Sequence, residues 1–163
     1  MAREFTLGGA NLTVVAATTV LFINPAAAPN FNLEMLRMWL SQSANATSAQ
    51  QRIQVETQVT SFPTLVSATP AKLKRADPNV SIITGNTTGA AGTCGINASG
   101  EGAGGKTVIF EDNFNVLNGW LYVPTPVETI VMPAGSASGM GMFWAAGPTT
   151  LTGWTCGLNY REV

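Results

Sequence analysis

The sequence predicts an all-β fold, an antiparallel sandwich or barrel formed by one domain that spans residues 1–163. Three observations predict it: many short segments rich in β-branched and aromatic residues, turns marked by Gly and Pro between them, and no stretch with a convincing helical period. A chain of this length can bury one large core without help from metals or disulfides.

The first strands are indicated by apolar runs and by alternation. Residues 14–23 form a β-branched apolar run that ends at a turn, and residues 1–12 are a candidate for an extended N-terminal arm. Residues 31–40 fit both a helical stripe and an alternating strand. We favour the strand, with a bulge where the alternation changes phase between Met35 and Leu36.

The run at residues 14–23 also imitates a secretory signal peptide, because three alanines follow it at residues 26–28. A signal peptide needs a positively charged leading region, whereas Arg3 is balanced here by Glu4. We therefore favour a strand and its turn over a signal peptide.

The rest of the chain is also predicted as strands and turns. Residues 53–59 alternate strictly between apolar and polar side chains, which is typical of a half-buried strand. Residues 85–105 consist mostly of Gly, Ala, Thr, Asn and Ser, and are predicted to form a long Gly-rich loop. Asn118-Gly119 lies between two apolar arms and predicts a hairpin. Further strands are expected at residues 108–110, 129–132, 140–144 and 154–160.

Residues 100–107, with the sequence GEGAGGKT, match the nucleotide-binding P-loop pattern letter for letter. A P-loop needs a helix after the motif, since the amides at the start of that helix hold the phosphates. Here the β-branched and aromatic sequence TVIF, residues 107–110, follows Lys106 directly. We therefore predict that Lys106 supports a loop at the base of a strand and that no nucleotide is bound.

Composition excludes several function classes. The chain has no histidine, which excludes Ser-His-Asp and Cys-His nucleophile systems and the usual zinc sites. Its net charge of -1 argues against a nucleic-acid-binding surface. Charged residues make up 10% of the chain, against roughly 25% in ordinary globular proteins. So little charge suggests a chain that works while packed against copies or partners.

Carboxylates offer one candidate site. Glu111 and Asp112 are adjacent, and with Glu101 or Glu128 they could form a glycosidase pair or a calcium site. Adjacent residues on a strand point to opposite faces, so we expect a polar strand end here.

Two further groups have both a functional and a structural interpretation. The four tryptophans could stack on sugars, but we expect them in the core or at a subunit interface: Trp39, Trp120, Trp144 and Trp154. The one basic cluster is expected to be a solvated loop, with a weak docking patch as the alternative: Lys72, Lys74 and Arg75.

Cys94 and Cys156 are expected to be reduced, buried thiols, with a disulfide as the alternative if the protein is secreted. Five glycosylation sequons carry meaning only after secretion: Asn11, Asn45, Asn79, Asn86 and Asn97. We expect no catalytic, cofactor-binding or metal-binding residues.

Residues 107–163 resemble a known family, most clearly in the segment FEDNFNVLNGWLYVPTPVETIVMPAGSASGMGMFWAAG, and the segment SAQQRIQVETQV shares the likeness more weakly. They are similar to the small β-sandwich virion proteins of tailed bacteriophages that act as head decoration or cement proteins. The resemblance implies a jelly-roll-like sandwich, trimers on a capsid lattice and no enzymatic residues. It also implies the major capsid protein as partner, and a location on the virion after assembly in the host cytoplasm.

We therefore expect a non-enzymatic structural protein that stabilises a capsid by bridging its subunits, without binding nucleic acid, membrane or nucleotide. The alternative is a carbohydrate- or receptor-binding module of a phage tail or fibre, or of a secreted protein. The few charges and the surplus of aromatic and methionine strand residues further predict a homotrimer with an apolar, salt-resistant interface.

Overall fold

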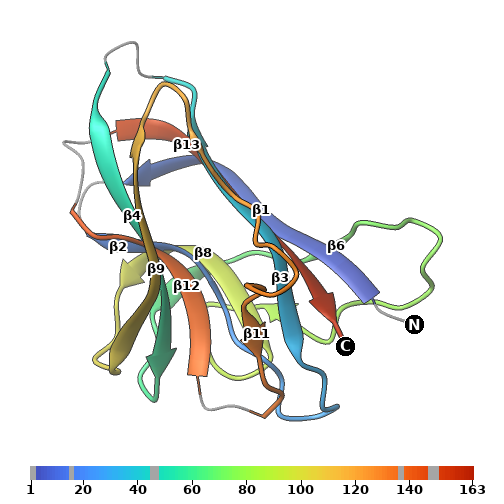
Figure 1. The fold of residues 1–163 in the computed structure, drawn as a ribbon. Helices are drawn as coiled ribbons and strands as arrows, with labels where there is room; N and C mark the ends of the chain where they lie inside the picture. Colours follow the sequence, from blue (N-terminus) through green and yellow to red (C-terminus); the bar gives the residue numbers. More distant parts are fainter. Residues whose placement is uncertain (1–2, 15–16, 45–47, 136–137, 147–150) are drawn as a thin grey trace.

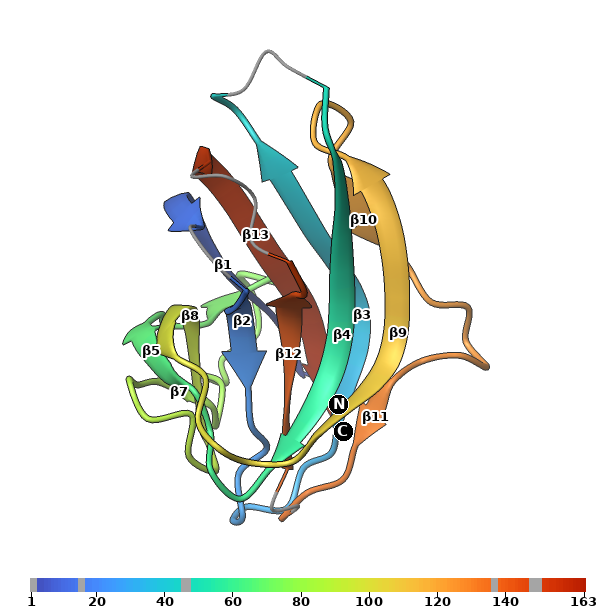
Figure 2. The ribbon, with the colours of Figure 1, turned by 90° about the vertical axis from the view of Figure 1, so that its left-hand side faces the viewer.

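The computed structural model describes residues 3–14, 17–44, 48–135, 138–146 and 151–163, and these form strands, turns and extended loops without a helix. Two sheets pack face to face, as Figures 1 and 2 show from two directions. The predicted all-β antiparallel sandwich is confirmed.

The first sheet has the strand order β10-β3-β13-β1-β6, with β11 also paired to β3. Its strands are β1 (Arg3–Val14), β3 (Leu33–Gln42), β6 (Ala71–Lys72), β10 (Trp120–Tyr122), β11 (Val131–Met132) and β13 (Leu151–Glu162). The second sheet has the order β5-β8-β2-β12-β4-β9, with β7 also paired to β8. Its strands are β2 (Thr18–Ile23), β4 (Gln50–Val59), β5 (Thr64–Ser67), β7 (Thr84–Gly85), β8 (Thr93–Gly100), β9 (Lys106–Asn115) and β12 (Ser138–Trp144).

The main strands pair in a nested way. Strand β1 pairs with β13, β2 with β12, β3 with β10 and β4 with β9, all antiparallel. The chain is therefore one long hairpin whose paired arms roll up into two sheets, which is the jelly-roll arrangement. Strands β5 to β8 are inserted between β4 and β9: β5, β7 and β8 extend the second sheet beyond β2, and β6 extends the first sheet beyond β1.

The strand predicted at residues 31–40 and its bulge are both confirmed in β3. Leu33 and Met35 are buried, and so are Met38 and Leu40, while Leu36 between the two pairs is not. Opposite this point the register of β13 shifts between the residues that face Met35 and Arg37. Leu36 is thus the extra residue of a bulge, and it lets both apolar pairs face the core.

The centre of the core holds an aromatic cluster. Met140, Met142 and Trp144 of β12 are buried on alternate positions, as the sequence predicted. The rings of Trp144 and Trp154 lie edge to face, 4.5 Å apart, and Phe114 packs against Trp144 at 5.8 Å. Three strands from both sheets thus contribute to one contact, which fixes how the sheets sit on each other.

The N-terminal predictions need correction. Residues 14–23 do not form one strand, because β1 ends at Val14 in the first sheet and β2 begins at Thr18 in the second. Residues 3–12 are not an arm either, since β1 pairs with β13 along this length and with β6 at Phe5 and Thr6. Phe5 and Leu7 point inward and are buried, so burial of apolar surface holds this strand in the sheet.

The predicted Gly-rich loop at residues 85–105 is also wrong over much of its length. It contains β8, which lies between β2 and β5 in the second sheet. Cys94 and Ile96 are buried there, although the segment is poor in large apolar residues. Gly95 is required for the close approach to β5, because a Cβ at this position would lie 2.7 Å from the Leu65 Cβ.

The Asn118-Gly119 turn does not close a hairpin. Strand β9 before it pairs with β4 in the second sheet, whereas β10 after it pairs with β3 in the first. The turn therefore carries the chain from one sheet to the other, and Gly119 takes a φ of +69°. The strands predicted at residues 53–59, 108–110, 140–144 and 154–160 are confirmed, and that at 129–132 is shortened to β11.

Candidate functional site

The GEGAGGKT motif forms a bend between β8 and β9, and β9 begins at Lys106 itself. The helix that a phosphate-binding loop requires does not follow it. Gly102 takes a φ of +67°, and a Cβ at Gly104 would lie 2.0 Å from the Val59 carbonyl oxygen. The glycines are therefore explained by close packing of the bend against the end of β4.

The amides of the bend donate to the protein itself. The Ala103 amide donates to Ser61 Oγ at 3.1 Å, and the Gly104 amide donates to the Ser61 carbonyl at 3.0 Å. Gln58 Nε2 also donates to the Ser61 and Glu101 carbonyls, at 2.7 and 2.8 Å. These donors serve the contact between the bend and residues 58–61.

Lys106 is the centre of an ion cluster on the outer face of the second sheet. Its Nζ lies 2.8 Å from Glu56 Oε1 and 2.8 Å from Glu101 Oε2, and 3.9 Å from the centre of the Phe143 ring. Glu101 also accepts hydrogen bonds from the amide and the hydroxyl of Thr19, both at 2.6 Å. The cluster clamps the bend onto β2, β4 and β12, which is the supporting role predicted for Lys106.

The two carboxylates of this cluster differ in their pKa. Burial raises the pKa of Glu56 above its usual value near 4.5, and the hydrogen bond from Lys106 only partly offsets this effect. Burial also acts to raise the pKa of Glu101, but hydrogen bonds from Lys106 and Thr19 outweigh it, so that this pKa is lowered. As the pH falls, Glu56 is therefore protonated before Glu101.

The other candidate carboxylates, Glu111, Asp112 and Glu128, each contact different partners. Glu111 pairs with Gln54 and, at 3.7 Å, with Arg52 on the outer face. Asp112 accepts a hydrogen bond from Trp120 Nε1 at 3.2 Å, and Glu128 accepts one from its own turn. Over the described ranges, no three Asp, Glu or Cys side chains gather as a metal site would require.

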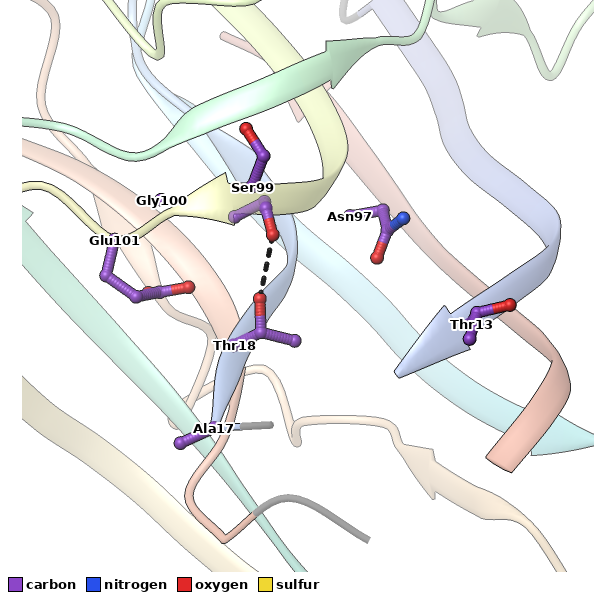
Figure 3. Close-up of a pocket in the computed structure, with 8 residues that line it drawn as sticks. Thr13, Ala17, Thr18, Asn97, Ser99, Gly100 and Glu101 are labelled. Atoms are coloured by element: carbon purple, nitrogen blue, oxygen red, sulfur yellow. Dashed lines mark hydrogen bonds between the residues drawn. The ribbon is translucent and has the colours of Figure 1, made fainter. Parts of the chain in front are cut away.

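A shallow pocket of about 250 Å³ lies where β1, β2 and β8 meet. Figure 3 shows Thr13 and Asn97 at one end of this pocket and Glu101 at the other, with Thr18 between them. The Thr18 hydroxyl donates to the Ala98 carbonyl at 3.0 Å, and Glu101 is already bonded to Thr19 and Lys106. Apart from the Glu101 carboxylate, which is already engaged, the pocket is lined by neutral polar residues and by alanine and glycine, without an aromatic wall.

The tryptophans divide into two groups. Trp120, Trp144 and Trp154 are buried in the core, as expected. Trp39 is only half-buried, and it lies on the outer face of the first sheet over Gly157, where a Cβ would be 1.9 Å from the Trp39 ring. The Arg37 guanidinium lies 4.9 Å from the centre of the Trp39 ring.

The remaining sequence candidates are located as follows. Lys72 is half-buried, and its ammonium donates to the Asp77 carbonyl at 2.8 Å, while Lys74 and Arg75 are exposed. Cys94 and Cys156 are buried and not bonded to each other, and burial raises the pKa of each thiol to about 12. Of the sequons, Asn45 lies outside the described residues.

The sequence predictions missed one surface, which we name the β9–β11 edge. It is formed by exposed apolar residues where both sheets end on the same side of the sandwich (Figure 2): Ile109, Leu121, Val123, Val127 and Val131. Among the described residues, seven of the twelve exposed large apolar side chains lie between residues 108 and 131. That clustering is unusual for the surface of a monomer.

The β9–β11 edge contains a groove of about 280 Å³, lined by Ile109, Phe110, Tyr122, Glu128 and Ile130. Next to it, the turn at residues 124–129 presents Val127 with 93% of its surface exposed. This turn is held by the Glu128 amide, which donates to the Thr125 carbonyl at 3.0 Å, and by the Thr125 hydroxyl, which donates to Glu128 at 2.8 Å. One signal was present in the sequence, since residues 107–160 contain no Lys or Arg.

No helix of a length and apolarity that would cross a membrane is found in the described part of the chain. Comparison of the chain with protein-family models, with curated proteins and with solved structures found no match.

Proposed function

We propose that the protein is a non-enzymatic structural component of a virion, which decorates a bacteriophage capsid and stabilises it by bridging neighbouring capsid subunits. The observation that supports this proposal most is the β9–β11 edge, a concentrated apolar surface on a jelly-roll sandwich. The resemblance of residues 107–163 to decoration proteins supplies the capsid as target. The proposed partner is the major capsid protein, and the proposed location is the capsid surface, reached in the bacterial cytoplasm.

The proposed mechanism is mass action. A protein that binds only the assembled lattice lowers the free energy of that lattice relative to free subunits. An apolar surface suits association with other copies of the chain or with the lattice, because burial of apolar area is not screened by salt. We also propose that the protein acts as a homotrimer, which brings several capsid-binding surfaces to one lattice site.

The test is addition of the purified protein to phage particles that lack it. We expect the protein to co-sediment with the particles and to raise the temperature at which they release DNA. Val127→Asp should reduce binding, whereas Val66→Asp, which changes an exposed valine on β5 away from the β9–β11 edge, should bind like the wild type. Absence of co-sedimentation at micromolar protein would contradict the proposal.

A second function is favoured by one observation. Trp39 is the tryptophan that remains accessible on an outer sheet face, and Arg37 beside it could donate hydrogen bonds to a sugar hydroxyl or carboxylate. Flat aromatic rings of this kind stack on sugars in carbohydrate-binding modules. Glycan-array binding that is lost in Trp39→Ala but kept in Leu121→Ala would favour a carbohydrate- or receptor-binding module over capsid decoration.

A further inference from the structure

Charge distinguishes the β9–β11 edge from the edge at β6. Residues 107–135 carry Glu111, Asp112 and Glu128 without any Lys or Arg, a net charge of -3, of which Glu111 lies 3.7 Å from Arg52 on β4. Residues 71–83 carry Lys72, Lys74 and Arg75 against Asp77, which is 3 - 1 = +2; Lys74 is paired with Glu4 of β1 at 3.0 Å, so Arg75 is, within the described part of the chain, the exposed cation of this edge that is free to meet a partner. Strands β6 and β10 lie at opposite ends of the strand order, so every copy has an acidic edge and a basic edge.

The basic edge is completed by the segment at residues 73–80, which follows β6. Figure 1 shows this part of the chain projecting from the body of the sandwich beside β6. The segment combines charge with apolar surface, since Lys74 and Arg75 are exposed, Leu73 is 40% exposed and Val80 is 72% exposed. It therefore has the same mixed character as the β9–β11 edge, with charge of the opposite sign.

Hydrogen bonds hold the segment at residues 73–80 in one shape. The Asp77 amide donates to the Lys74 carbonyl at 3.1 Å, and the Asn79 amide donates to Asp77 Oδ1 at 2.9 Å. Beyond the segment, the Ser81 hydroxyl donates at 2.6 Å to the buried carboxylate of Glu162. A surface that is already ordered loses less conformational entropy when it binds.

We infer that the segment at residues 73–80 of one copy docks on the β9–β11 edge of a second copy, with Val80 against the apolar groove and Arg75 against Glu128. Apolar contact supplies affinity, and charge selects which edges meet. Because the two surfaces differ, the contact is head to tail, and in the proposed homotrimer its repetition closes into a ring. The inference rests on the proposed homotrimer and names the surfaces through which its copies associate. The β9–β11 edge then serves the contact between copies, and Val127→Asp reduces capsid binding by preventing that assembly.

The alternative symmetric contact, in which two β9 strands pair edge to edge, is less favourable. It would place Glu111 and Asp112 of one copy close to the same residues of the other, and like charges across an interface oppose association. The head-to-tail contact avoids this repulsion and covers exposed apolar residues on both edges.

The first experiment measures association of the purified protein by sedimentation equilibrium, without any capsid present. Val80→Asp and Val127→Asp should each raise the dissociation constant by at least about tenfold, as loss of a central apolar contact does. The matched control is Val66→Asp, which places the same charge on an exposed valine outside both surfaces and should associate like the wild type. Circular dichroism melts check that all variants fold.

The second experiment reverses the charges. Arg75→Glu and Glu128→Arg should each weaken association, and the double variant should restore it, because the pair is then re-formed with opposite polarity. A wild-type protein that stays monomeric at about 100 μM, which corresponds to a dissociation constant of about 1 mM or weaker, would overturn the inference. A control as disruptive as Val80→Asp, or a double variant that fails to recover, would do the same. Copies that associate but do not bind capsid particles would overturn the proposed function and leave the inference standing.

Discussion

Replacement of Lys106 by methionine tests the ion cluster quantitatively. Methionine keeps the apolar stem of the lysine beside Phe143 but removes the charge that lies 2.8 Å from both Glu56 and Glu101. The Glu56 side chain is 5% exposed, so its carboxylate is left buried without a counter-ion. Breaking a buried ion pair from one side typically costs about 3–5 kcal/mol of unfolding free energy.

Protonation of Glu56 sets an upper limit to this loss. At about 1.36 kcal/mol per pH unit, neutralising a carboxyl with a usual pKa of 4.5 costs about 3.4 kcal/mol at pH 7 and about 0.7 kcal/mol at pH 5. A raised pKa gives stability that is present below 4.5 and is lost as the pH rises through the folded-state value. Loss of Lys106 raises the pKa of Glu56 further, so the variant should be weakened by about 3 kcal/mol at pH 7 and, through Glu56, by no more than about 0.7 kcal/mol at pH 5.

Loss of the Lys106–Glu101 contact also destabilises the variant more at pH 7 than at pH 5. Its lowered pKa gives the wild type stability that is present above 4.5 and is lost as the pH falls, and this contribution shrinks without Lys106. Urea unfolding at pH 7 and pH 5 measures both differences. In Lys106→Met/Glu56→Gln the buried charge is absent, and most of the loss at pH 7 should be recovered. An equal loss at both pH values, or a double variant no more stable than Lys106→Met, would refute the assigned cause.

Three further predictions follow from the same structure. Calorimetric titration of the wild-type protein with ATP and Mg²⁺ should give no heat of binding, and a micromolar affinity would contradict the role assigned to the GEGAGGKT bend. Cys94 and Cys156 should resist alkylation in the native state and both react after denaturation without reductant, whereas a protected pair in mass spectrometry would reveal a disulfide. Gly104→Ala should lower the unfolding free energy by about 1–3 kcal/mol, because its Cβ would meet the Val59 carbonyl. Gly100→Ala meets nothing within 4 Å and should be neutral; equal melting temperatures for the two variants would count against this packing argument.

The sandwich could be predicted from the sequence because apolar and polar side chains alternate along several of its main strands. In β3 and β12 the side chains that alternate are also the ones that are buried, so local pattern and tertiary position agree. The bulge at Leu36 could be predicted for the same reason, because the alternation of apolar residues changes phase there. Strand β8 was not visible, since its neighbours require small residues where β-propensity would place large ones.

The partners of each strand could not be predicted in the same way. Asn118-Gly119 has the composition of a hairpin turn, but Phe114 and Trp120 on either side are held by different sheets. A turn that closes a hairpin and a turn that crosses between sheets have the same local chemistry. Only the long-range pairing of the flanking strands distinguishes them. The β9–β11 edge was missed on similar grounds, because it is assembled from segments whose apolar residues would serve equally well in a core.

The nested pairing of the strands has a consequence for how the chain acquires its structure. Strand β1 lies between β13 and the two-residue strand β6, so β1 waits for a strand that lies more than a hundred residues later in the chain before its sheet is complete. The ion pair of Arg3 with Glu162, at 2.5 Å, joins the two ends of this interval. Contacts so distant along the chain slow folding, because the entropy of closing the loop is lost before the contacts form. The first sheet can therefore be completed only after β13 has been synthesised, and β1 lacks its main partner until then.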